Sequence, residues 1–319
     1  MLIYFKYILI KGGGGRKMKA EKIWMDGKMI DWDKAQIHVC SHALHYGSGV
    51  FEGIRAYQTG KGTAIFRLKE HVDRMFNSAK ILKMEISHSK KDIIKAIKDT
   101  IKINNLKSCY IRPLVFRGFK ELGINPFNCP VVCVVAVWEW GAYLGEDSLT
   151  KGIKTKISSY TRNHVNSTSQ KAKICANYIN SLFAKMEAIE AGVDEAILLD
   201  TEGYVAEGAG ENLFWVRNGA IYTTPTNTVL EGITRDSVIK IAQDMGCQIQ
   251  EKRTGRDELY ISDEVFFTGT AAEVTPVREI DKYQIGDGIR GPITEKIQKR
   301  FFEITKGQVG KYSKWLEYI

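Results

Sequence analysis

The sequence lacks the features of membrane and secreted proteins. No stretch of its 319 residues approaches the roughly 20 consecutive apolar residues that a membrane-spanning helix needs. Cysteine is scarce: six cysteines are scattered through the chain, and no two of them form a C-x-x-C pair. Scattered cysteines in a chain of this length are typical of reduced thiols. We therefore expect a cytoplasmic protein.

Basic residues are in excess, but they are not concentrated. The formal net charge is +9, and the lysines alternate with acidic residues instead of forming a block. Nucleic-acid-binding proteins usually cluster their basic residues on one face. The pattern therefore favours solvated surfaces with some positive potential for anionic substrates, and leaves a nucleic-acid-binding protein as the non-enzyme alternative. A hydrophobic content of 44% suits a globular protein of one or two domains.

The first seventeen residues differ from the rest of the chain. They join a short apolar run, interrupted by Lys6, to four consecutive glycines. A signal peptide needs a longer apolar region and a small-residue cleavage site, and no such site follows here. We expect that residues 1–17 are an extension absent from the native protein and that Met18 is its first residue.

Hydrophobic periodicity predicts helices packed on antiparallel strands. Asp26-Gly27 and Asn218-Gly219, each between apolar residues, predict hairpins. Apolar residues at helical or alternating spacing predict the other elements, which are helices over 68–82, 92–103, 178–191, 234–245 and 293–302 and strands over 109–116, 130–138 and 264–267. These elements indicate an α+β fold. We expect a small α+β domain over 18–139, an interdomain loop over 140–148 and a larger domain, rich in short strands, over 149–319.

Residues 37–46 are expected to be extended. On a strand, His38, Cys40 and His42 would share one face, which is a pattern that can bind a metal. His45 would need a different backbone geometry, and no second ligand cluster occurs. Ordinary packed or hydrogen-bonding side chains are therefore favoured, and no metal is expected.

A lysine amine and a carboxylate flank a segment that contains one predicted helix followed by one apolar strand. Lys171 and Lys173 precede the helix, and Glu207 follows the strand in the glycine-rich run AEGAGEN. Pyridoxal phosphate needs a lysine amine to hold its aldehyde and a carboxylate to keep its ring nitrogen protonated. Glycines beside the carboxylate allow the backbone to approach a flat ring closely. The pattern therefore favours a pyridoxal-phosphate site over a surface lysine and a solvated glutamate.

Several ordered motifs resemble those of branched-chain amino acid aminotransferases, which are pyridoxal-phosphate enzymes of fold type IV. The segments that carry the resemblance are HALHYGSGVFEGIRAY, YIRPL, WGAYLG, KAKICANY, YVAEGAGENLF, LEGITRDSV and FFTGTAAEVTPV. The resemblance implies the two-domain fold of D-amino acid aminotransferase and amino transfer between L-leucine, L-isoleucine or L-valine and 2-oxoglutarate. It also implies a homodimer or an assembly of dimers, with pocket residues contributed across the interface. D-amino acid aminotransferases and aminodeoxychorismate lyases share this fold and remain alternatives, although YIRPL and EGAGENLF favour the branched-chain enzyme.

The resemblance also selects one lysine. The family's reactive lysine lies three positions before a Gly-Asn-Tyr tripeptide, which is replaced here by Ala176-Asn177-Tyr178. This register assigns the catalytic role to Lys173, while Lys171 is a structural residue. Tyr178 is implied to hydrogen-bond the ring hydroxyl of the cofactor. Cys175 stands where relatives often have glycine, which changes the backbone but not the chemistry.

Two loops and one arginine predict a phosphate site. Gly232-Ile233-Thr234 opens a helix, whose free N–H groups favour an anion. Thr268-Gly269-Thr270 follows an apolar strand and can form a second anion nest. By resemblance, Arg74 and Thr270 bind the cofactor phosphate together with Ile233 and Thr234. The N–H groups of Thr270 and Ala271 are implied to hold the substrate carboxylate.

An apolar pocket for a branched side chain is expected from four aromatic residues, Phe51, Tyr46, Tyr143 and Trp140. Because apolar pockets discriminate weakly by size, leucine, isoleucine and valine should all be accepted. The side-chain carboxylate of glutamate needs a cation within reach. Tyr110 and Arg112 share one strand face, and a guanidinium fits a carboxylate bidentately. Both are therefore predicted to bind substrate, with a structural salt bridge as the alternative for Arg112.

Overall fold

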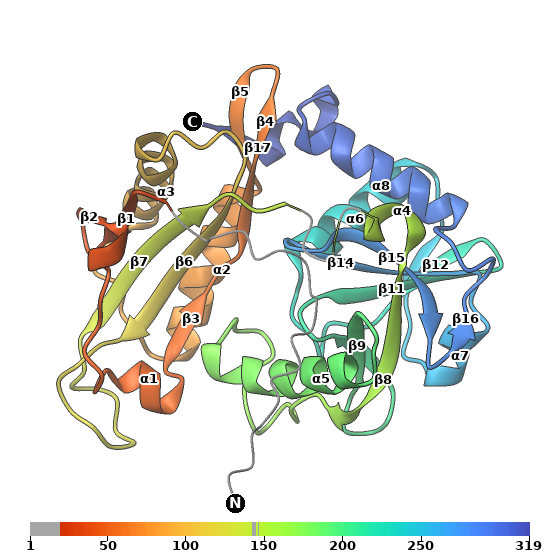
Figure 1. Ribbon diagram of the computed structural model, residues 1–319, viewed down its shortest axis with the longest axis horizontal. Helices are drawn as coiled ribbons and strands as arrows, with labels where there is room; N and C mark the ends of the chain where they lie inside the picture. The colour runs from red at the N-terminus through yellow and green to blue at the C-terminus, as the bar shows by residue number, and fades with distance from the viewer. Residues whose placement is uncertain (1–19, 142–144, 146) are drawn as a thin grey trace, which may run out of the picture.

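The computed structural model describes residues 20–141, 145 and 147–319. Within them the chain forms two sheets that lie side by side, each covered by helices (Figure 1). The two hairpins predicted from Asp-Gly and Asn-Gly are confirmed, since Met25 pairs with Lys28 and Arg217 with Ala220. All four turn residues have positive φ, between 42° and 87°. Asparagine, aspartate and glycine tolerate that conformation best, which explains their presence at these turns.

The first sheet has the strand order β17-β5-β4-β6-β7-β1-β2, with β3 paired to β6. Helices α2 and α3 pack on this sheet through apolar side chains at helical spacing, of which Leu68, Val72, Ile93 and Ile97 are buried. The bounds of these elements are β1 Lys22–Met25, β2 Lys28–Asp31, α1 His42–Tyr46, β3 Gly49–Phe51, β4 Ile54–Thr59, β5 Gly62–Phe66, α2 Leu68–Ile81, α3 Lys90–Ile103, β6 Cys109–Arg117 and β7 Val131–Trp138.

The second sheet has the strand order β10-β9-β8-β15-β14-β11-β12-β13, with β16 paired to β15. Along β11, Phe214 and Val216 face one apolar cluster with α6 and α8, while Leu213 and Trp215 face another. The bounds are α4 Ser148–Lys151, β8 Ile153–Thr161, α5 Tyr178–Glu190, β9 Glu195–Leu199, β10 Val205–Gly208, β11 Asn212–Arg217, β12 Ala220–Thr223, α6 Ile233–Asp244, β13 Ile249–Glu251, α7 Arg256–Tyr260, β14 Glu264–Gly269, β15 Glu273–Ile280, β16 Tyr283–Gln284 and α8 Pro292–Thr305.

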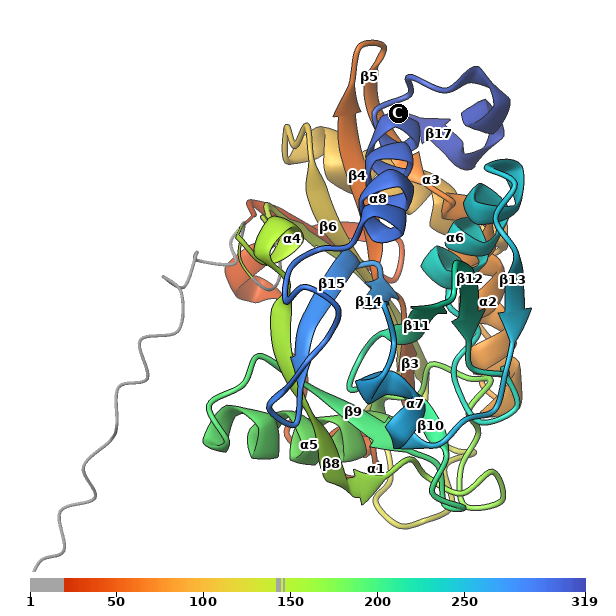
Figure 2. The ribbon, with the colours of Figure 1, turned by 90° about the vertical axis from the view of Figure 1, so that its right-hand side faces the viewer.

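The end of the chain returns to the first sheet. Strand β17 (Leu316–Tyr318) pairs antiparallel with β5, so that Leu316 lies opposite Phe66. Phe66 in turn packs edge-on against Phe301 of α8, with ring centroids 5.5 Å apart. Figure 2 shows β17 near β5 and beside the upper end of α8. This apolar contact joins the two halves of the molecule. The division at residues 140–148 stays a prediction, and residues 142–144 and 146 of that loop, like residues 1–17, lie outside the described part of the chain.

The prediction of an extended chain over residues 37–46 is wrong for its second half. His42–Tyr46 form the short helix α1, which ends at Gly47 with a φ of 64°. The alternation of His38, Cys40 and His42 therefore does not lie on a strand. His42 instead contacts the Ser48 hydroxyl at 2.7 Å through Nδ1. Among the described residues, no helix is long and apolar enough to cross a membrane.

Candidate active site

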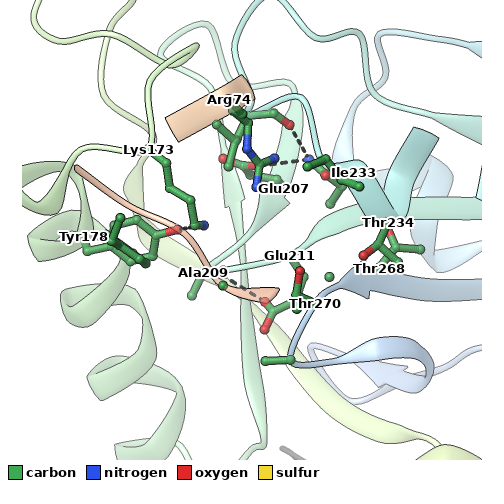
Figure 3. A pocket seen from close by; sticks show the side chains of 18 of the residues that line it. Arg74, Lys173, Tyr178, Glu207, Ala209, Glu211, Ile233, Thr234, Thr268 and Thr270 are labelled. Carbon is green, nitrogen blue, oxygen red and sulfur yellow. Dashed lines mark hydrogen bonds between the residues drawn. The ribbon is translucent and has the colours of Figure 1, made fainter. Parts of the chain in front are cut away.

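A cavity opens at the junction of the two sheets and collects most of the predicted site residues (Figure 3). The first half contributes side chains from β3, α2 and β6, and the second half contributes β10 and the start of α6. The predicted residues that line the cavity are Phe51, Arg74, Tyr110, Arg112, Trp140, Lys173, Tyr178, Glu207, Ile233, Thr234, Thr270 and Ala271. Tyr46 does not line it but lies exposed on α1. Tyr143 falls outside the described residues.

The two candidate lysines occupy different environments. Lys173 Nζ projects into the cavity and donates a hydrogen bond to the Tyr178 hydroxyl at 2.5 Å (Figure 3). Its backbone is held on both sides, because its amide bonds the Ser78 hydroxyl and its carbonyl accepts the Phe51 amide. Lys171 is exposed, and its Nζ pairs with the Glu231 carboxylate at 2.5 Å. Of the two lysines, only Lys173 therefore has its amine inside the cavity.

Glu207 presents a buried carboxylate to the same cavity from β10. The Arg162 guanidinium lies 2.7 Å from its Oε1, and the Asn212 side-chain amide donates to its Oε2 at 3.1 Å. Oε1 nevertheless accepts no hydrogen bond from the described residues. Burial raises the pKa of the Glu207 carboxyl, against the opposing effect of Arg162 and Lys173. A further cationic partner facing this carboxylate from the cavity would add to the effect of Arg162 and favour the charged form.

Asn212 and Gly232 connect this carboxylate to the start of α6. The Asn212 amide also donates to the Leu230 carbonyl at 2.9 Å. A Cβ at position 232 would lie 1.9 Å from the Asn212 side-chain oxygen, so only glycine fits there. Helix α6 begins at Ile233, and its first N–H groups have no partner within the helix. The sequence motif predicted an anion site at this helix start, which stays a prediction, and nothing in it indicated the contacts of Asn212.

Arg74 is held by a buried acid that sequence reasoning missed. Its Nε and Nη2 bond the two carboxylate oxygens of Glu52 at 2.7 Å each, and His71 contacts the same carboxylate at 2.8 Å. Burial opposes ionisation of Glu52, but Arg74 and His71 together lower the pKa of its carboxyl to about 2. The third Arg74 nitrogen, Nη1, donates to the Glu231 carbonyl immediately before α6. Arg74 is thus aligned beside the helix start.

Arg112 lies among the aromatic rings of the cavity. Its guanidinium is 4.6 Å from the Phe51 ring centre, and its Nη2 donates to the Tyr110 hydroxyl at 3.0 Å. The Tyr110 ring packs edge-on against Trp140 at 4.4 Å. Within the described part of the chain, Arg112 forms no ion pair, and its buried Nε has no hydrogen-bond partner. The structural salt bridge considered as an alternative is therefore absent from these residues.

A second buried ion pair ties the two rims of the cavity together. Arg55 on β4 lies 2.7 Å from the Glu273 carboxylate on β15, and both side chains are buried. Arg55 also donates to the carbonyls of Trp140 and Gly141, while Glu273 directly follows the turn over residues 270–272. No local sequence pattern pairs residues that are so far apart in the chain. The pair fixes the loop that carries Trp140 against the turn that carries Ala271.

The lysine amine, the buried carboxylate and the anion site at a helix start define a pyridoxal-phosphate type of site on a fold type IV framework. The sequence pattern of the family described as amino-transferase class IV matches residues 49–280, which is most of the chain. The chain belongs to the class IV aminotransferase family. Both the resemblance noted in the sequence and the predicted α+β fold are confirmed.

Known relatives agree over nearly the whole length. The branched-chain-amino-acid aminotransferase of Pseudomonas aeruginosa is 51% identical over 293 residues, covering 92% of this chain and 95% of that protein. The Escherichia coli K12 enzyme of the same name is 45% identical, covering 94% and 98%. The crystal structure of the T.th. branched-chain amino acid aminotransferase with pyridoxamine 5'-phosphate has 54% identity and a TM-score of 0.92, covering 95% of this chain and 99% of that one. The same enzyme was also solved with 4-methylvaleric acid.

Proposed function

We propose that the protein is a branched-chain amino acid transaminase. It transfers the amino group reversibly between L-leucine, L-isoleucine or L-valine and 2-oxoglutarate, with pyridoxal 5'-phosphate as the cofactor. The observation that carries this proposal is the cavity itself, in which Lys173 Nζ and the buried Glu207 carboxylate both face one space beside the start of α6. Amino acid biosynthesis in the cytoplasm is the expected setting, and the six free cysteines support it.

The residues present fit this cofactor. Glu207 Oε1 and Thr268 Oγ1 are buried, face the cavity and have no hydrogen-bond partner among the described residues, so a bound polar group would satisfy them. Lys173 would attach the cofactor, and Tyr178 would hold its ring hydroxyl. Arg74, Ile233, Thr234 and Thr270 would bind the phosphate.

Bound at this site, pyridoxal phosphate would supply an electron-withdrawing ring that stabilises the negative charge left when Cα of the substrate loses a proton. Glu207 would keep the ring nitrogen protonated, because a buried anion favours a cation beside it. Lys173 would take the proton from Cα of the substrate and deliver it to the cofactor, as general base and then general acid. The hydrogen bond from Lys173 Nζ to Tyr178 keeps the amine in the cavity for both transfers.

One cavity must accept both an alkyl side chain and a second carboxylate. Phe51, Tyr110 and Trp140 provide apolar surface, and Arg112 lies among them without an acidic partner in the described residues. Its guanidinium can therefore pair with the side-chain carboxylate of glutamate. When leucine is bound, Arg112 keeps its contact with the Phe51 ring and its bond to the Tyr110 hydroxyl, which limits the cost of an unpaired cation.

An exposed apolar face supports a dimer. On α5, Ile179, Leu182, Phe183 and Met186 are all exposed by 42–55%. Tyr46 lies near this face, because it lines the same surface hollow as Ile179. Large exposed apolar patches usually mark interfaces. We infer that a second copy of the chain covers this face and that Tyr46 completes a substrate pocket across the interface.

The test is to purify the protein with pyridoxal phosphate, record its absorption spectrum and then add a single amino donor without acceptor. L-Leucine should convert the spectrum of the bound cofactor, and 2-oxoglutarate should restore it. D-Alanine under the same conditions is the control for the D-amino acid aminotransferase alternative. Conversion by D-alanine but not by L-leucine would overturn the proposal, as would a protein that binds no cofactor.

A further inference from the structure

Three buried glutamates occupy neighbouring segments, with Glu195 on β9, Glu207 on β10 and Glu211 immediately before β11, and the last two line the cavity. Glu195, Glu207 and Glu211 are exposed by only 1%, 4% and 5%. Two of them have a cation: Lys185 Nζ is 2.8 Å from Glu195, and Arg162 is 2.7 Å from Glu207. Glu211 forms no ion pair with any residue that the structure describes. Its Oε2 accepts a hydrogen bond from the backbone amide of the preceding residue at 3.0 Å.

The other elements around Glu211 bring no free cation toward it from the described residues. From α5, Lys185 is already bound to Glu195. From β14, Gly269 contributes no charge, and Glu273 on β15, which pairs with Gly269 in register, has its carboxylate bound to Arg55. Glu211 therefore shares its surroundings with other acids, each of which has a cation of its own.

This environment favours the protonated form of Glu211. Burial raises the pKa of its carboxyl, and the negative charge of Glu195 raises it further, to about 8, against the opposing effects of the Gly210 amide and Lys185. Glu211 therefore keeps its proton at neutral pH.

Glu211 also contacts the turn at which the substrate carboxylate is expected. It lines the cavity together with Gly269, Thr270 and Ala271. A Cβ on Gly269 would lie 3.4 Å from Glu211 Cγ, and a Cβ on Gly208 would lie 2.9 Å from Glu211 Oε2. The acid is thus packed between two glycines, and Figure 3 shows Glu211 and Thr270 next to each other in the cavity wall.

We propose that Glu211 is a positioning residue that controls binding of the substrate α-carboxylate. As a neutral acid it supports the turn over residues 269–271 and leaves that turn free to accept an anion, and as an anion it repels the substrate. This role rests on the proposed function, because it takes the turn as the site of the substrate carboxylate. A substrate carboxylate bound at this turn beside an ionised Glu211 places two like charges next to each other, which is unfavourable where burial limits their screening by water.

The proposal predicts a specific pH dependence. If the substrate carboxylate binds only while Glu211 keeps its proton, the dissociation constant should rise roughly tenfold per pH unit once Glu211 begins to ionise. The probe is 4-methylpentanoate, a branched carboxylate without an amino group, so that it cannot react. Its binding to the cofactor-loaded protein would be titrated from about pH 6 to about pH 10, using the spectrum of the bound cofactor and, independently, calorimetry.

Glu211→Gln is the decisive variant, because an amide has the shape of the neutral acid and cannot ionise. In this variant, the dissociation constant of 4-methylpentanoate should no longer rise tenfold per pH unit above about pH 8, as it does in wild type. Glu85→Gln, which removes an exposed surface carboxylate, is the matched control and should keep the wild-type profile. Equal slopes in wild type and Glu211→Gln would overturn the role of Glu211, since the titration would then belong to another group, such as the cofactor-linked amine.

Glu195→Gln provides a second test that leaves Glu211 in place. Without the negative charge of Glu195, one cause of the raised pKa of Glu211 is removed, so the midpoint of the pH profile should move to lower pH. An unchanged midpoint would contradict the proposal even if Glu211→Gln fails to fold. If wild type does not bind 4-methylpentanoate at any pH and leucine does not convert the cofactor, the proposed function itself is wrong. If leucine converts the cofactor and binding of the probe is independent of pH, only the role of Glu211 is wrong.

Discussion

Substitution of Arg112 by leucine separates the two half-reactions of the proposed enzyme. In wild type, the Arg112 guanidinium lies over the Phe51 ring and has no acidic partner among the described residues, so its capacity for a carboxylate is unused. Leucine fills part of the same volume with apolar surface and removes the charge. The alkyl chain of a branched substrate should tolerate this change, while the second carboxylate of glutamate should not.

The magnitude follows from the bonds that are lost. A hydrogen bond to a charged group contributes about 1.5–3 kcal/mol, and a bidentate guanidinium–carboxylate pair contains two of them. The carboxylate in the variant regains some solvation through the cavity mouth, so we expect a net loss of about 3 kcal/mol in the glutamate half-reaction. That loss corresponds to roughly a 150-fold fall in the single-turnover rate constant divided by the dissociation constant. The leucine half-reaction should change by less than about fivefold, because size discrimination in apolar pockets is weak.

The assay follows the spectrum of the bound cofactor after rapid mixing with L-glutamate or L-leucine alone. Arg112→Lys is an informative intermediate, since it keeps the charge but loses the planar fork, and its loss toward glutamate should be partial. Arg300→Leu on the exposed side of α8 is the control and should behave as wild type. Equal losses toward glutamate and leucine would refute the reasoning, because Arg112 would then serve the common α-carboxylate or the folded structure.

Three further predictions concern Lys173, Glu207 and Glu52. Lys173→Ala should abolish covalent cofactor attachment, measured by borohydride reduction and mass spectrometry, and reduce turnover at least about 10³-fold, while Lys171→Ala should keep most activity. Full activity in Lys173→Ala would exclude its catalytic role. Glu207→Gln should retain the cofactor but lower kcat by about 10²-fold or more, because an amide cannot hold a protonated ring nitrogen; an unchanged kcat would assign that nitrogen another partner. Glu52, with its pKa lowered to about 2, should contribute about 3 kcal/mol of stability that is present above the unfolded-state pKa of a glutamate and is lost as pH falls toward 2. The difference in unfolding free energy between wild type and Glu52→Gln should therefore shrink on acidification, and a pH-independent difference would contradict this.

Local sequence patterns were sufficient for much of the framework. The amphipathic helices α2 and α3 and the Asp-Gly and Asn-Gly hairpins depend on neighbouring residues, so their positions could be predicted to within a few residues. The exception is α1, a helix of five residues, which is too short for a periodic pattern to reveal. Motif register also separated Lys173 from Lys171, and the structure shows only the former amine in the cavity.

The partners of the site residues were decided by the tertiary structure alone. The sequence shows that Arg74, Glu207 and Glu211 exist, but not that Glu52 aligns Arg74 or that Glu211 lacks a cation among the described residues. Arg55 and Glu273 lie on different sheets, and their pairing depends on how those sheets pack. Strand β17 rejoins the first sheet for the same reason. Burial and charge pairing between distant segments are properties of the packed fold, and they determine which of several similar side chains is ionised, held in place or free to bind.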